Sequence, residues 1–187
     1  MRFLTKRNRA ILREMVSTDF KLRYQDSVLG YVWSLMRPMF MFVVLYLVFA
    51  VIFPVGKEVP NFAIYLLLGI VLWTFFLEVT SNGLNAVVGR GELLRKISIP
   101  RYLLVVSVSV SALINLALNL VVVAIFASIS AVPLTFSILI LPIIIAELYV
   151  FALALAFILA ALYVRFRDVS HIWDIVTQAA FYATPIV

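Results

Sequence analysis

From Tyr102 to Val164 the chain carries a single charged residue, Glu147. A run this long exceeds the roughly 20 apolar residues that one bilayer-crossing helix needs, so it must hold more than one span. The rest of the sequence agrees, because 65% of the 187 residues are hydrophobic and only 13% are charged. Soluble domains are nearer half apolar and a quarter charged. The surplus apolar surface must face lipid, which predicts an all-α, polytopic membrane helix bundle.

The distribution of helices along the chain predicts one membrane domain over 1–187. We expect an amphipathic helix at 1–24, spans at 33–53, 62–88, 102–127, 135–164 and 172–187, and a cytosolic loop at 89–101. The last span has about 16 residues, fewer than a bilayer requires. Either the pair Thr184-Pro185 ends a half-helix or the sequence stops inside the span, and we expect the second. In the amphipathic helix, the aliphatic face is expected to contact acyl chains; packing on a partner is the alternative.

Basic residues set the expected orientation. If the N-terminus is cytosolic, segments 1–37, 89–101 and 165–171 hold 8, 4 and 2 Lys and Arg residues, and the outer loops hold one, Lys57. This asymmetry is the positive-inside pattern. It predicts a multi-pass membrane protein with a cytosolic N-terminus. The basic N-terminal segment would contact anionic membrane lipids. Nucleic acid is not an expected partner, because little soluble surface remains to bind it.

The sequence lacks the residues that most chemistry requires. There is no cysteine and one histidine, His171, so thiolate and multi-histidine metal sites are excluded. No G-x-x-x-x-G-K-[ST] phosphate-binding loop is present, and no nucleophile elbow or H-E-x-x-H pair occurs. We therefore assign no catalytic residue, metal or cofactor to the chain. If it performs work, the energy source lies in another protein.

Polar residues form two stripes within the expected spans. Glu78, Asn82 and Asn85 recur at helical spacing in the second span, beside Ser81. The third span carries polar residues at every fourth position, which are Ser107, Ser111, Asn115 and Asn119. Each stripe lies on one helix face. Such residues either hydrogen-bond neighbouring helices or line a hydrophilic path. We favour hydrogen bonding for the third-span stripe and leave the second open. For Glu147, a structural hydrogen bond is favoured over proton relay.

The loop at 89–101 contains a short segment with both charges and leucines. Glu92, Leu93, Leu94, Arg95 and Lys96 predict one or two helical turns that end before Pro100. A short amphipathic helix on the cytosolic side is suited to docking in a partner's groove. An ordinary basic loop is the alternative, and the residues alone leave both open.

Three motifs resemble those of a known family, the type-2 ABC exporter permeases that move polysaccharides, O-antigens or teichoic acids out of bacteria. They are DFKLRYQDSVLGYVWSLMRP at 19–38, ELLRKISIPR at 92–101, and YVRFRDV at 163–169 with TPI at 184–186. The resemblance implies an interfacial N-terminal helix and six spans, of which about five are present. It also implies a permease homodimer bound to two copies of a separate ATPase subunit, which holds ATP and Mg.

The resemblance also implies roles for particular residues. Glu92 to Lys96 would form the coupling helix that contacts the ATPase, and the substrate would be a lipid-linked glycan. Aromatic rings of the first and fifth spans would contact the sugar. Together with the second-span stripe, this selects as translocation-path candidates Tyr31, Trp33, Trp73, Glu78, Asn82 and Asn85.

Other functions remain open. One is a type-2 ABC exporter of drugs or other small lipophiles. A different class is a membrane-embedded acyl- or glycosyltransferase, for which Glu78 and Glu147 are the only intramembrane acids or bases. A structural membrane scaffold is a third.

Overall fold

A computed structural model describes residues 6–24, 32–52, 60–91, 94, 99–130 and 136–184. Within these residues every regular element is a helix, which confirms the predicted all-α class. In chain order they are α1 (Lys6–Tyr24), α2 (Val32–Tyr46), the π-helix η1 (Leu47–Ile52), α3 (Phe62–Ala86), α5 (Arg101–Ile129), the 3₁₀ helix η3 (Phe136–Ile140), α6 (Leu141–Arg165) and α7 (Val169–Ala183).

Four helical stretches are long and apolar enough to cross a membrane. They cover Trp33–Ala50, Phe62–Ala86, Arg101–Ile129 and Ile138–Arg165. Helix α7 has 15 residues, about 22 Å at 1.5 Å per residue, and is shorter than the hydrocarbon core of about 30 Å. The chain is a multi-pass membrane protein, and its fifth expected span is represented by a helix of less than full span length.

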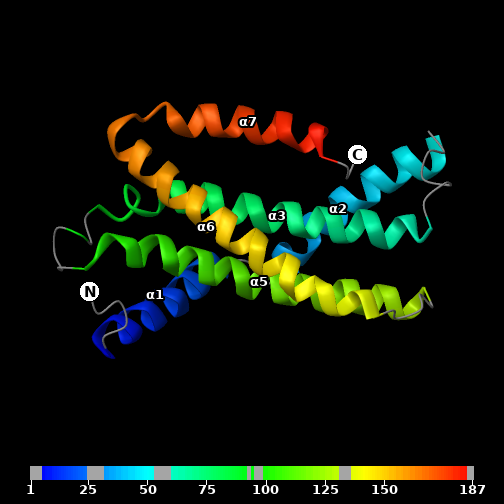
Figure 1. Cartoon of the computed structure of the whole chain (residues 1–187), viewed down its shortest axis with the longest axis horizontal. Helices are drawn as coiled ribbons and strands as arrows, with labels where there is room; N and C mark the ends of the chain where they lie inside the picture. The colour runs from blue at the N-terminus through cyan, green and yellow to red at the C-terminus, as the bar shows by residue number, and fades with distance from the viewer. Residues whose placement is uncertain are drawn as a thin grey trace.

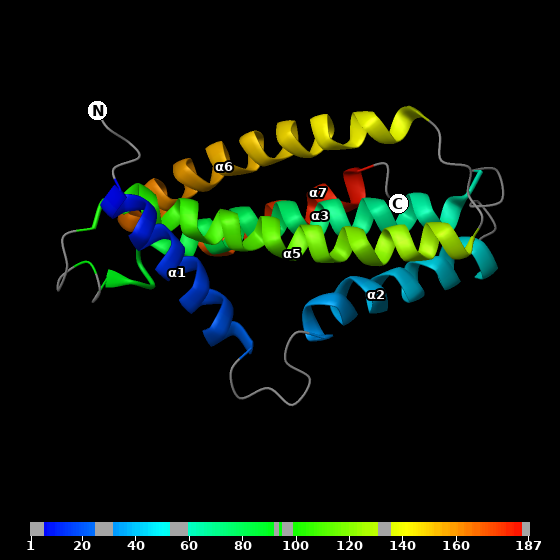
Figure 2. The same ribbon diagram turned by 90° about the horizontal axis from the view of Figure 1, so that it is seen from below.

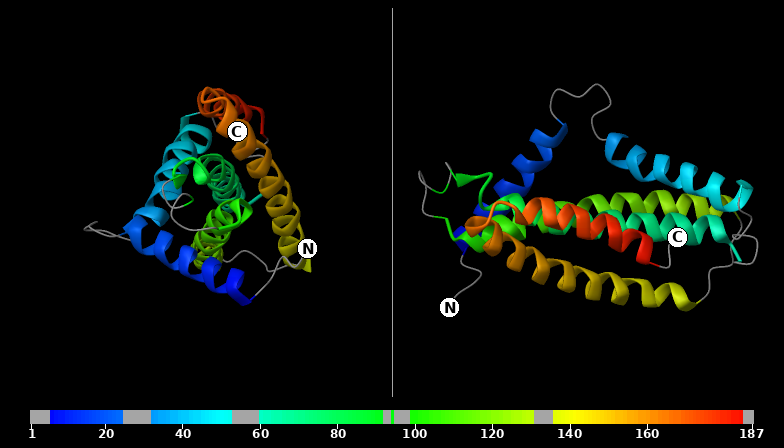
Figure 3. Two further views of the ribbon diagram at one scale, coloured as in Figure 1. Left: turned by 90° about the vertical axis from the view of Figure 1, so that its left-hand side faces the viewer. Right: turned by 90° about the horizontal axis from the view of Figure 1, so that it is seen from above.

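The helices form an elongated bundle with one strongly basic end. Helices α3, α5, α6 and α7 run along its length, and α1 crosses obliquely at one end (Figure 1). Viewed from that end, α3 and α5 occupy the centre, with α1, α2, α6 and α7 around them (Figure 3). We call this end the basic end, because it holds the turn after α3, the start of α5 and the α6–α7 turn, with Arg90, Arg101, Arg165 and Arg167.

The core lies where α3, α5 and α6 meet. Helix α3 contributes ten buried residues, among them Leu66, Phe75 and Val79. Its last turns approach α6 very closely, because a Cβ atom placed on Gly83 would lie 2.6 Å from the Cβ of Ala156. Small residues at such a crossing let two helix backbones meet, which is how apolar helices gain packing energy where lipid removes the hydrophobic drive.

Helix α1 turns its aliphatic face toward the protein. Ile11, Leu12 and Val16 are half-buried, and Met15 packs against the core cluster, while basic residues such as Arg9 and Arg13 are exposed. The helix packs on α5 and leaves the bundle on the same side as α2 (Figure 2). Part of this face therefore contacts α5, and the half-buried side chains keep apolar surface beyond that contact. That this surface meets acyl chains stays a prediction. Where α1 lies relative to a membrane stays a prediction.

Two prolines act at helix ends. Pro142 lies at the start of α6, where the missing amide hydrogen has no cost. Helix α7 ends at Ala183, and Thr184 adopts an extended conformation with φ −82° and ψ 151°. A residue before proline is forced into that region, so Pro185 accounts for the end of α7.

The contact between Gly83 and Ala156 makes a testable prediction. Substitution Ala156→Val adds two methyl groups where no space remains, and overpacking of this kind costs about 1–3 kcal/mol. We expect a matching loss of stability in thermal unfolding of the detergent-solubilised protein. The control is Ala154→Val, an identical change at an exposed position of the same helix. Equal stability of the two variants would contradict the close crossing.

Candidate functional site

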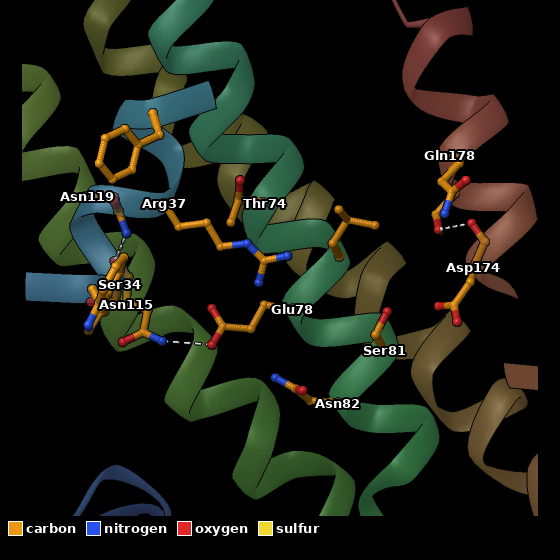
Figure 4. Close-up of a pocket in the computed structure, with 14 residues that line it drawn as sticks. Ser34, Arg37, Thr74, Glu78, Ser81, Asn82, Asn115, Asn119, Asp174 and Gln178 are labelled. Carbon is orange, nitrogen blue, oxygen red and sulfur yellow. Dashed lines mark hydrogen bonds between the residues drawn. The ribbon is translucent and has the colours of Figure 1, made fainter. Parts of the chain in front are cut away.

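An open, polar pocket of about 1000 Å³ lies between α2, α3, α5 and α7 (Figure 4). Side chains from all four helices enter it, and most of them are polar. The lining residues are Trp33, Ser34, Arg37 and Phe40 of α2, Thr74, Leu77, Glu78, Ser81 and Asn82 of α3, Asn115 and Asn119 of α5, and Asp174, Thr177 and Gln178 of α7.

Glu78 of α3 is hydrogen-bonded to α5, which forms another wall of the pocket. The Nδ2 atom of Asn115 donates a hydrogen bond of 2.7 Å to Oε1 of Glu78. A carboxylate in an apolar bundle needs such donors, because lipid supplies none. The bond joins α3 to α5 and brings together one residue from each of the two sequence stripes.

The third-span stripe divides into two parts. Toward the basic end, Ser107 and Ser111 are buried, and their hydroxyls donate to backbone carbonyls of Leu104 and Ser107 at 2.8 and 3.1 Å. Farther along, Asn115 and Asn119 line the pocket, and Asn119 Nδ2 donates to the Asn115 carbonyl at 2.9 Å. The two serine hydroxyls thus donate within α5, and the hydrogen bonding between elements that the sequence favoured is seen where Ser107 accepts from Arg90 and where Asn115 donates to Glu78. That the second part lines a transport path stays a prediction.

Helices α2 and α7 supply charges that the sequence stripes did not reveal. Arg37 extends from α2 into the space that Glu78 and Asn82 enter from α3, and Asp174 and Gln178 face it from α7 (Figure 4). The signals were present, since Arg37 is a charge within the first apolar run. On α7, Asp174 and Gln178 share one face four residues apart.

The six path candidates from the sequence fall into three groups. Trp33, Glu78 and Asn82 line the pocket. Trp73 is not among its lining residues; its ring lies 5.5 Å from that of Phe76 and 5.7 Å from that of Phe181, within an aromatic contact between α3 and α7.

Of the remaining two candidates, Asn85 is exposed away from the pocket, and its side chain donates to the Ser81 carbonyl at 3.1 Å. Tyr31 lies outside the described residues. A role in transport stays a prediction for all six candidates.

The expected coupling segment is described only in part. Glu92, Leu93, Arg95 and Lys96 lie outside the described residues. Leu94 packs partly against the core cluster, and its amide donates to the Arg90 carbonyl at 3.2 Å, which is the spacing of an α-helical turn. The Arg90 side chain forms an ion pair with Asp19 and donates to the Ser107 hydroxyl at 3.1 Å.

Glu147, for which a structural hydrogen bond was favoured over proton relay, has an exposed side chain. It lies on the side of α6 opposite the buried residues Ala152 and Ala156. It does not line the pocket. The described residues hold no group of three or more metal-ligating side chains.

Comparisons with known proteins place this architecture. Residues 12–187 match the family described as ABC-2 type transporter. The chain belongs to this family. The O-antigen export system permease protein RfbA of Myxococcus xanthus is 31% identical over 179 residues, covering 96% of this chain and 68% of that relative. Two relatives of the same description from Klebsiella pneumoniae are 24% and 25% identical, each covering 95% of this chain and 68% of its own length. Membership of an ABC transporter family implies a partner that hydrolyses ATP.

The hydrogen bond between Glu78 and Asn115 yields a prediction about stability. Substitution Asn115→Ala removes the donor and leaves a carboxylate oxygen short of a partner, which costs about 1–3 kcal/mol. We expect a lower midpoint in thermal unfolding of the detergent-solubilised protein. Asn85→Ala serves as the control, because Asn85 is exposed and bonds only within its own helix turn. An Asn115→Ala midpoint equal to that of Asn85→Ala would show that the bond does not hold α3 to α5.

Proposed function

We propose that this chain is the membrane-spanning permease subunit of an ATP-driven exporter that moves a lipid-linked polysaccharide across the bacterial inner membrane. Family membership supports the ABC permease, and the three relatives, all named O-antigen export permeases, support the polysaccharide cargo. ATP and Mg are bound by the partner ATPase in this proposal, and the chain itself performs no catalysis.

The composition of the pocket is the observation that carries the choice of cargo. Sugars present many hydroxyl groups, which carboxylates and amides bind, and apolar ring faces, which aromatic side chains stack on. The pocket supplies the carboxylates of Glu78 and Asp174, several amides, and the rings of Trp33 and Phe40. Arg37 adds a planar cation of the kind that binds the phosphate of a lipid carrier. A pocket for purely lipophilic drugs would not need this density of polar groups.

Partners and orientation complete the proposal. The segment Glu92 to Lys96 docks on the ATPase as a coupling helix, and its start at the turn after α3 supports this, because that turn lies at the basic end. Two copies of the chain form the permease. The N-terminus and the basic end lie on the cytosolic side, supported by the concentration of Lys and Arg there.

The pocket is tested by one substitution made at two places. Glu78→Gln removes a charge that lines the pocket, whereas Glu147→Gln makes the same change on the outer side of α6. Hydrogen bonds to charged groups contribute about 1.5–3 kcal/mol, so we expect surface polysaccharide to fall about tenfold or more for Glu78→Gln only. The assay co-expresses the full-length permease and its ATPase in a strain lacking its own exporter. Equal export by both variants would exclude Glu78 from the path.

The orientation is tested by cysteine labelling, for which the cysteine-free sequence is a clean background. We expect a membrane-impermeant maleimide to label Lys57→Cys in intact cells, because Lys57 lies in an outer loop in this orientation. Lys96→Cys should be labelled only after the cells are opened. The reverse pattern would invert the topology and would place the coupling segment out of reach of a cytosolic ATPase.

A further inference from the structure

Arg90 connects four parts of the chain at the basic end. Its guanidinium forms an ion pair with Asp19 of α1 and donates to Ser107 of α5 at 3.1 Å. Its backbone carbonyl accepts the amide of Leu94, in the coupling segment, at 3.2 Å. The preceding residue, Gly89, donates to the carbonyl of Asn85 at the end of α3, at 2.9 Å. A displacement of the coupling segment therefore acts on Arg90 first.

The two charged side chains are held in a partly dry environment. The side chains of Asp19 and Arg90 are 18% and 23% exposed, and Ser107 is fully buried. Arg90 is thus fixed on α5, and Asp19 is held against it by the packing of α1. A second contact nearer the start of α1, from Asn8 to the Tyr102 hydroxyl at 3.1 Å, joins α1 to α5 as well. Of these two contacts, the one made by Asp19 reaches the turn that carries the coupling segment.

The helix that contains Asp19 precedes, in the chain, a helix that lines the pocket. Helix α1 ends at Tyr24 and α2 begins at Val32. The first two turns of α2 carry Trp33, Ser34 and Arg37, which line the pocket. Asp19 at the basic end and Arg37 at the pocket therefore lie on consecutive helices of the chain, and the ion pair joins the first of these helices to the turn that precedes the coupling segment.

We propose that the Asp19–Arg90 ion pair is the link that transmits movement of the coupling segment to α1, and through α1 to the α2 wall of the pocket. This rests on the proposed function, because it assumes that an ATPase moves the segment. Asp19 and Arg90 are positioning residues, since neither lines the pocket. Because the two side chains are mostly buried, removing one charge leaves the other short of its partner and lowers stability whether or not the pair transmits movement. A transmitting role is therefore read from the response to nucleotide and from its rescue by charge reversal, which a merely structural role would not produce.

The experiment follows the α2 wall directly. The full-length chain carries one reporter cysteine, Ser34→Cys, and is assembled with its ATPase in lipid nanodiscs. The measured quantity is the rate at which a small maleimide labels the reporter, without nucleotide and with ATP and vanadate. Asp19→Asn should abolish the difference between the two rates while ATP hydrolysis continues. The charge reversal Asp19→Arg with Arg90→Asp should restore the difference, because it rebuilds the ion pair.

Glu14→Gln is the matched control, since it removes one negative charge from an exposed position of the same helix; it should leave the nucleotide effect intact. A nucleotide effect in Asp19→Asn as large as in the parent would overturn the link and leave the proposed function standing. The same holds if the charge reversal restores assembly but not the nucleotide effect. Absence of any nucleotide effect in the parent would refute the pocket as the transport path, and the link with it.

Discussion

A polar group placed among apolar helices must find its partner within the protein, because lipid offers neither donors nor acceptors. Within the spans, this constraint explains where α3 and α5 meet, and at the basic end a second polar contact adds to it. Asn115 and Glu78 join α5 to α3, and Arg90 joins the end of α3 to α1 and α5. In both places a hydrogen bond or an ion pair specifies one arrangement out of many that apolar packing alone would allow. The same arrangement shapes the pocket, because Glu78 and Asn115 also line it.

Packing between small residues complements these polar contacts. Gly83 and Ala156 let α3 and α6 approach until no further atom fits, and Ala152 and Ala160 extend the same buried face of α6. Because α6 is held on that side, its opposite side is free of the core, and there it carries Glu147. A mid-span carboxylate on an outer face has a high free-energy cost if that face of α6 contacts lipid.

The sequence was sufficient for properties that depend on local pattern. Hydropathy and charge predicted the all-α class, and α3 begins at Phe62, where the second span was expected. The stripes containing Glu78 and Asn115 predicted which faces are polar. The sequence could not predict which residues contact each other across helices, because spacing within one helix does not fix the rotation of that helix against another. For that reason the sequence did not show that the ring of Trp73 contacts Phe181 of α7, and Asp174 was overlooked although it lines the pocket.

The walls of the pocket differ in how firmly they are held. Helix α3 buries ten residues and α5 twelve, whereas α7 buries only Thr177 and Phe181. Within the 18 residues of the first candidate span, on α2 and η1, 11% are buried. In the corresponding 18-residue stretch of α3 the buried share is 33%. Segments with few buried apolar contacts open at lower free-energy cost than the core. The walls formed by α3 and α5 are therefore held firmly, and those formed by α2 and α7 are held weakly. An ATP-driven movement would enlarge this pocket by displacing α2 and α7 while the hydrogen bond between Glu78 and Asn115 stays intact.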